Sequence, residues 1–224
     1  MGGLGWQELV IILIILAVIA IPLAILIVGV RSALDNRRRV ESGQVSGQEY
    51  AGFWLRAAAE LADGLILLIP SRIVGRIADG LQPGQTGQLG GGVAGWIIAL
   101  VYTVILNGRG ATLGKRWARI RVIDDAGNPP GLARASVRAA IPFGLRLLLL
   151  IASLRIAVVQ EQNGPAISTG AAAATALFLV LMLIDYLWMI WDPRKQTLHD
   201  KLAGTFVTLD AQIHSPVATA VDPF

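Results

Sequence analysis

Six ionisable side chains lie inside stretches of the sequence that are otherwise apolar, and they are the residues best placed to do chemistry. These residues are Arg56, Glu60, Asp63, Arg146, Arg155 and Asp185. The first three follow one another at spacings of four and three residues, which places them on one stripe of a helix. A charge inside an apolar segment is energetically unfavourable, and it marks either a packed interior or a path for ions.

The balance of these charges leaves two interpretations open. The apolar stretches hold three acids and three arginines, so that every charge can have a partner. We expect Asp63 to lie beside Arg146 or Arg155, and Asp185 to pair with Arg146. Full pairing would favour a structural role, because interhelical polar contacts in membranes contribute about 1–2 kcal/mol each. An unpaired Asp63 or Glu60 beside water would instead favour transport or a proton relay.

A second set of polar residues lies in two segments that flank the apolar stretches, "GATLGKRW" (110–117) and "WDPRKQTLHDKLAGTFV" (191–207). The residues are Gly114, Lys115, Arg116, Asp192, His199 and Asp200. We expect Asp200 to cap or pair with the loop at 112–116, where Gly114 permits close backbone approach. The alternative is a cytoplasmic site for an anion or ion that uses Lys115, Arg116 and His199.

The composition indicates that the chain is an integral membrane protein. It has 224 residues, of which 54% are hydrophobic and only 15% charged. Apolar runs of about 18 residues or more can cross a hydrocarbon core of ~30 Å as helices. The sequence predicts five such spans, at residues 9–30, 52–70, 88–108, 139–159 and 171–191. The predicted fold class is therefore an all-α membrane protein with five transmembrane helices and small cytoplasmic elements rich in β-branched residues.

The distribution of basic residues predicts the orientation of these spans. Segments 31–51, 108–138 and 192–224 hold four, seven and three Lys or Arg residues, whereas 71–87 holds two and 160–170 none. Cytoplasmic loops carry the excess of Lys and Arg. We therefore expect the N-terminus outside and the C-terminus in the cytoplasm.

The sequence divides into four parts. We expect an uncleaved transmembrane anchor at 1–31, a cytoplasmic linker at 32–47, a four-span domain at 48–209 and a polar tail at 210–224.

Shorter features complete this picture. The pattern of 71–81 predicts a short helix on the outer surface, and the glycine-rich 84–92 a flexible connector. Pro142 suits the first turn of the fourth span. The β-branched stretches at 119–124 and 205–209 could pair as strands.

The residues and motifs that the sequence lacks, and the places of its basic residues, argue against several classes of function. It has no cysteine and only two histidines, His199 and His214, which argues against disulfides, iron–sulfur clusters and multi-histidine metal sites. No hydrolase or protease motif is present. The basic residues cluster between spans, so we expect no nucleic-acid partner. We expect no enzyme activity and no cofactor.

Three segments, in order, resemble the RDD family of bacterial membrane proteins over residues 48–209. They are "YAGFWLRAAAELADGLIL" (50–67), "GATLGKRWARIRVIDDAGNPPGLARASVRA" (110–139) and the closing segment 191–207. The resemblance implies that Arg56, Asp63 and Asp200 are the signature charges, with Asp192 as a rival for the last place. It also implies a bacterial cytoplasmic (inner) membrane protein, a family suspected of transport, with sodium/proton exchange proposed for some members.

Two functions from different classes follow as expectations. The first is a structural, accessory or assembly subunit of a larger membrane complex, with the lipid bilayer and other subunits, or a second copy, as partners. The additional N-terminal anchor favours it. The alternative is a small ion or solute transporter of the sodium/proton exchange type that uses Asp63, Glu60 and Arg56.

Overall fold

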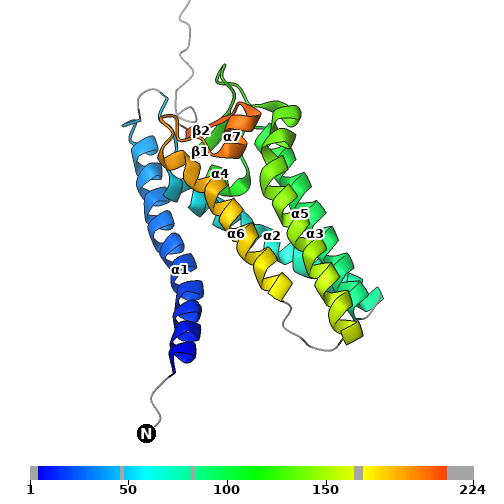
Figure 1. Cartoon of the computed structure of the whole chain (residues 1–224). Coiled ribbons are helices and arrows are strands. Elements are labelled where there is room, and N and C mark those ends of the chain that lie inside the picture. The colour runs from blue at the N-terminus through cyan, green and yellow to red at the C-terminus, as the bar shows by residue number, and fades with distance from the viewer. Residues whose placement is uncertain (1–4, 46–47, 82–83, 164–168, 211–224) are drawn as a thin grey trace, which may run out of the picture.

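A small polar cap, made of residues 32–45, 109–138 and 191–210, lies at one end of a set of long helices, and the first residues that the structure describes lie at the other end (Figure 1). The computed structural model describes residues 5–45, 48–81, 84–163 and 169–210. The predicted tail, with His214, lies outside these residues apart from Asp210. In chain order the elements are α1 (Trp6–Glu41), α2 (Phe53–Leu81), α3 (Gln85–Gly108), α4 (Leu113–Trp117), β1 (Ile120–Ile123), α5 (Gly131–Asn163), α6 (Thr169–Leu187), the 3-10 turn η1 (Trp188–Ile190), α7 (Leu198–Ala203) and β2 (Phe206–Leu209).

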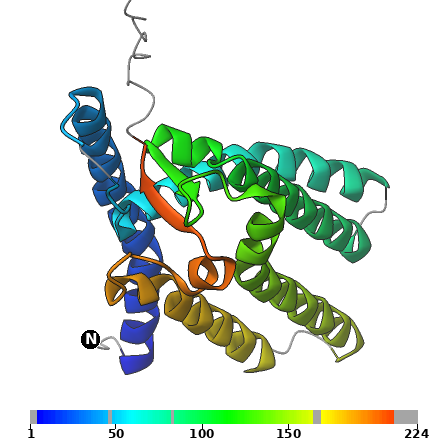
Figure 2. The ribbon, with the colours of Figure 1, turned by 90° about the horizontal axis from the view of Figure 1, so that it is seen from above.

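Three helices of the described part of the chain are long and apolar enough to cross a membrane. The segments are Leu89–Gly108 in α3, Gly131–Ser153 in α5 and Ala173–Ile190 in α6 and η1. They confirm the predicted helical membrane architecture in outline, but not the count of five spans. The predicted spans at 9–30 and 52–70 lie within α1 and α2, and they stay predictions. Helix α2 carries charges along its length and runs obliquely to α3 and α5 (Figures 1 and 2).

Glycines set the packing of α2 against α3. A Cβ atom built on Gly91 would lie 2.8 Å from the Cα atom of Gly75, so the two backbones touch at this point. Gly95, one turn further on, packs on Ser71. Small residues at four-residue spacing are the usual means by which helices approach closely in membranes.

This packing corrects two predictions. The glycine-rich 84–92 is helical from Gln85 onward and is not a flexible connector. The predicted surface helix at 71–81 continues α2 through Pro70 without a break. A proline removes one backbone hydrogen bond, but an apolar environment strongly favours keeping the remaining ones within the helix.

The predicted linker at 32–47 is also different in the structure. Helix α1 continues to Glu41, and Ala33, Val40 and Val45 are buried in the hydrophobic core of the cap. The Asn36 side-chain amide donates to the carbonyl oxygen of Ala118 at 2.9 Å. Residues 32–45 therefore pack as part of the cap.

The two predicted strands pair, as expected. β1 and β2 are antiparallel, with Val122 opposite Val207. These two side chains and Ile120 are fully buried. Helix α5, however, begins at Gly131, so Pro142 lies within the helix and not in its first turn. The additional turns at the start of α5 place Arg138 in the cap, where it binds a residue of α7 that is described below.

Candidate functional site: a buried charge network in the cap

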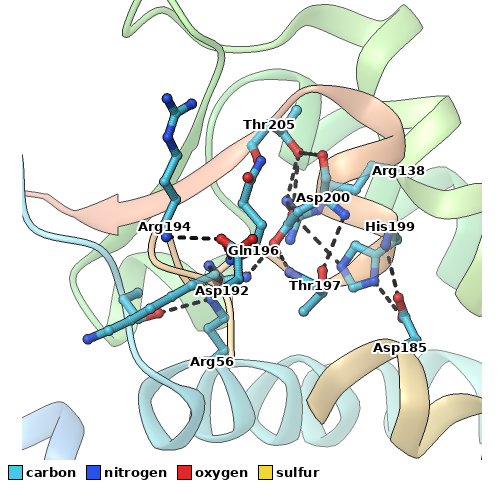
Figure 3. A network of polar contacts seen from close by, with 12 residues as sticks. Arg56, Arg138, Asp185, Asp192, Arg194, Gln196, Thr197, His199, Asp200 and Thr205 are labelled. Carbon is cyan, nitrogen blue, oxygen red and sulfur yellow. Dashed lines mark hydrogen bonds and ion pairs between the residues drawn. The ribbon is translucent and has the colours of Figure 1, made fainter. Parts of the chain in front are cut away.

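Asp200 lies at the centre of a buried network that joins three helices (Figure 3). One of its carboxylate oxygens accepts a hydrogen bond from Arg56 of α2, and the other accepts one from Arg138 of α5. Asp200 itself is on α7 and is 0% exposed. Because two helices that are far apart in the sequence each donate a guanidinium to one carboxylate, Asp200 ties both helices to the cap.

Local sequence positions the Asp200 carboxylate. Thr197 is the N-cap of α7, and its side chain accepts from the backbone N–H of Asp200 while the Asp200 carboxylate accepts from the N–H of Thr197. This reciprocal arrangement is a capping box. Gly204 ends the helix in the left-handed conformation, with φ of 60°. One short, doubly capped helix therefore presents the carboxylate to both arginines.

The electrostatic environment keeps Asp200 ionised. Burial alone would raise the pKa of Asp200, but the nearby guanidiniums of Arg138 and Arg56 outweigh it and hold the pKa well below its usual range. Arg56 is fixed in turn, since its Nη2 donates to the carbonyl oxygen of Lys195 at 2.6 Å and its Nε to that of Ala51 at 3.1 Å.

This arrangement corrects the predicted partner of Asp200. The described contacts of its carboxylate are with Arg56, Arg138, Thr197, Thr205 and, at 3.9 Å, the ring of His199, and not with Lys115, Arg116 or the backbone of 112–116. Lys115 instead bonds Glu60, with Nζ 2.9 Å from Oε1. Arg116 is exposed.

Asp63 is the residue that holds the segment 112–116, which the structure shows to be the N-cap and the first residues of the short helix α4 and which we continue to call the loop. Its Oδ1 accepts from the Tyr102 hydroxyl at 2.6 Å and from the Gly114 N–H at 2.7 Å, and its Oδ2 accepts from the Thr112 hydroxyl at 2.6 Å. Asp63 is only 5% exposed. The prediction that it lies beside Arg146 or Arg155 is wrong, because neutral donors from α3 and from the loop occupy both of its oxygens.

Gly114 does allow a close backbone approach, but to α2 and not to the segment of Asp200 as predicted. A Cβ atom built on Gly114 would lie 2.1 Å from the carbonyl oxygen of Ala59 and 2.9 Å from the carboxylate of Asp63. The loop therefore rests directly on the backbone of α2, and only glycine fits at this position.

Asp185 pairs with His199 and not with Arg146. The Asp185 carboxylate accepts from the backbone N–H of His199 at 2.9 Å, and its second oxygen lies 2.6 Å from Nδ1 of the ring. Arg146 instead lies over the ring of Phe143, 5.0 Å from its centre. Arg155 is exposed. Asp185 is in the last turn of α6, where His199 at the start of α7 lies against it.

Asp192 closes a turn. Its carboxylate accepts from the backbone N–H of Arg194 at 2.9 Å and of Gln196 at 3.2 Å, and it pairs with Lys201. Burial raises the pKa of Asp192, but the hydrogen bonds from Lys201 and the two backbone groups outweigh it, and the net pKa is lowered. Asp192 thus stabilises the segment that leads into α7.

Comparison with known protein families shows the family of this chain. The model of the RDD family matches residues 50–204, a range that includes Arg56, Asp63 and Asp200. The chain belongs to the RDD family. It is also similar to a protein of Bacillus subtilis (strain 168), "Uncharacterized protein YckC", with 28% identity over 167 residues, 70% of this chain and 83% of the relative. No solved structure matches the chain.

Several residues that bind Asp200 or Asp63 could not be predicted by searching for charges in apolar stretches of the sequence. Arg138 precedes the predicted fourth span, and Tyr102 and Thr112 carry no charge. Thr197 could have been found, because a threonine three residues before an acid at the start of a helix is typical of a capping box.

The described residues contain no group of three or more His, Cys, Asp or Glu side chains that could hold a metal ion.

A small cavity lies beside the network, and we call it the polar chamber. It has a volume of about 30 Å³, and its lining includes Glu60, Thr103, Asn107, Arg138, Arg146, Tyr186 and His199. Asn107 is 2% exposed, and its Oδ1 has no hydrogen-bond partner among the residues that the structure describes. A buried amide oxygen is rarely left without a partner, so this space suits a water molecule.

Proposed function

We propose that this RDD protein is a non-conducting accessory or assembly subunit of the bacterial inner membrane, in which Arg56, Asp63 and Asp200 lock the cap onto the helices. The observation that carries the proposal is that both acids, Asp63 and Asp200, are buried and fully hydrogen-bonded. Asp63 and Asp200 are 5% and 0% exposed, and each accepts hydrogen bonds on both oxygens. Carboxylates whose two oxygens both accept hydrogen bonds have no free oxygen for an ion.

Asp200, and not Asp192, is the third signature residue in this proposal, because Asp200 contacts Arg56. The cap lies in the cytoplasm, and the N-terminus lies outside. The support is the excess of Lys and Arg in the segments of the cap, since such segments stay on the cytoplasmic side.

An apolar groove between α3 and α5 supports an accessory role. It has a volume of about 630 Å³, and its lining includes Ser136, Ala140 and Gly144 at four-residue spacing on α5. Small residues in this pattern are typical of surfaces on which transmembrane helices associate. The occupant in this proposal is an apolar helix of a partner subunit.

Filling the groove tests the accessory role. With a photoreactive residue in place of Leu132, which lines the groove and is 59% exposed, we expect one discrete protein adduct in native membranes. Ala140→Leu should abolish this adduct without lowering the melting temperature, because the added side chain occupies the space of the partner helix. Ala176→Leu, at an exposed position of α6, is the control and should leave the adduct intact. Adducts with lipid alone, or equal adducts in both variants, would contradict the proposal.

A second candidate function rests on the polar chamber. Glu60 borders this space together with the unpartnered oxygen of Asn107, and a cavity of this size can hold a water molecule. The alternative is therefore a transporter of the sodium/proton exchange type, with Glu60 at the chamber in place of Asp63. Proton flux into liposomes that is lost in Glu60→Gln would support it.

A further inference from the structure

A second hollow lies between α2 and α3, in the half of α3 that points away from the cap. It has a volume of about 510 Å³. The residues that line it are Ser71, Arg72, Gly75, Arg76, Asp79, Gly91, Gly92 and Gly95. The charge network and the polar chamber do not include these residues.

The chemistry of this hollow suits a phosphate group. Arg72 and Arg76 are one helical turn apart, and both are exposed. Neither makes a hydrogen bond or ion pair with a side chain that the structure describes. Guanidinium groups bind phosphate oxygens through paired N–H donors. The glycines leave the floor without side chains, so a headgroup can approach the helix backbones.

The position of the hollow suits a lipid better than a free ion. Gly91 and Gly95 lie near the start of the apolar segment Leu89–Gly108, which is the depth at which lipid headgroups meet the hydrocarbon. Apolar side chains of the same part of α2, Ile73 and Ile77, are 55% and 57% exposed. They can contact acyl chains while the arginines contact the headgroup.

We propose that this hollow binds the phosphate headgroup of an anionic phospholipid, in the leaflet opposite the cap. Two arginines and Asp79 give the hollow a net charge of one positive unit, which matches a headgroup with one negative charge. The site is independent of whether the protein conducts ions, because none of its residues belongs to the network or the chamber.

The test measures, by native mass spectrometry, how tightly defined lipids bind to the purified full chain in detergent. We expect phosphatidylglycerol to bind more tightly than phosphatidylethanolamine, and diacylglycerol, which lacks the phosphate, to bind weakly. One arginine near an anionic surface contributes about fivefold in affinity, so Arg72→Gln with Arg76→Gln should weaken phosphatidylglycerol binding by roughly twenty-five-fold. Asp79→Asn should strengthen it.

The control is Arg109→Gln with Arg116→Gln, which removes two other exposed arginines and should change binding little. Melting temperatures of both double variants should equal that of the wild type. Equal loss of binding in the two double variants would overturn the site, since the attraction would then be non-specific. Competition by millimolar inorganic phosphate would identify a site for a free anion, and tight binding of diacylglycerol would identify an apolar surface only. Either result overturns the proposal.

Discussion

Replacing Asp200 with alanine should lower the free energy of unfolding by about 3–5 kcal/mol, because it leaves buried arginines without their shared carboxylate. Arg56 and Arg138 are 4% and 5% exposed, so water cannot replace the lost partner. The variant also loses the capping box of α7. Thermal unfolding of the wild type and the variant in the same detergent measures the effect.

Asp210→Ala is the matched control, since Asp210 lies at the edge of the cap with a longer contact of 3.8 Å to Arg121. We expect Asp210→Ala to lower the free energy of unfolding by less than about 1 kcal/mol.

The lowered pKa of Asp200 also determines how the stability depends on pH. Its ionised form stabilises the folded state above the unfolded pKa of ~3.9, and this contribution is lost only as the pH falls through the lower folded pKa. The deficit of Asp200→Ala should therefore be constant from pH 5 to 8. Equal melting temperatures for the two alanine variants would contradict the central position of Asp200.

Gly114→Ala should be nearly as damaging. The new methyl group would lie 2.1 Å from the carbonyl oxygen of Ala59, which belongs to the backbone of α2 and cannot rotate away. The loop must move off the helix, and the hydrogen bond from the Gly114 N–H to Asp63 must break with it. Overpacking in a rigid core costs about 1–3 kcal/mol, and loss of a charged hydrogen bond adds about 1.5–3 kcal/mol.

Gly64→Ala provides the comparison for this variant. Gly64 is the neighbour of Asp63 in α2, and a Cβ atom built on it meets nothing within 4 Å. Alanine there should be neutral or stabilise the helix by up to about 1 kcal/mol. The two melting temperatures, measured together, separate a clash at the contact between Gly114 and α2 from a general intolerance of alanine for glycine around Asp63. A Gly114→Ala variant as stable as Gly64→Ala would show that the loop does not rest on the helix.

Part of this architecture could be predicted from the sequence. Apolar runs predicted the helices that contain residues 89–108 and 173–190, and β-branched stretches predicted the pairing of β1 with β2. A close backbone approach at Gly114 was also predicted, although the partner is α2 and not the segment of Asp200. These features are local, or they depend on composition, and they do not require knowledge of how helices rotate against one another.

The partners of the charges could not be predicted in the same way. The predicted pairing assumed that each acid binds an arginine. Asp63 is instead bound by two hydroxyl groups and a backbone N–H. Pairing also depends on which helix faces meet, and spacing within one helix does not determine this. Arg138 entered the network only because α5 begins eight residues before the predicted fourth span at 139–159, at Gly131.

The packing of residues 32–45 escaped prediction for a related reason. Their arginines, serine and glutamine are typical of a solvated linker, whereas the residues that pack, Ala33, Val40 and Val45, are few and widely spaced. They share one hydrophobic cluster with residues of the cap strands, which are distant in sequence. A pattern within one segment contains no information about such contacts.

The central claim is that the signature charges hold the cap in place and do not carry ions, and proton flux is its most direct test. Wild type, Asp63→Asn and Glu60→Gln are each placed in liposomes with a pH gradient, with and without sodium, and the internal pH is followed. We expect all three to match protein-free liposomes, and Asp63→Asn to show a lower melting temperature, because the neutral amide weakens the bonds from Tyr102, Thr112 and Gly114. Flux through the wild type that disappears in Asp63→Asn, with the melting temperature unchanged, would contradict the claim.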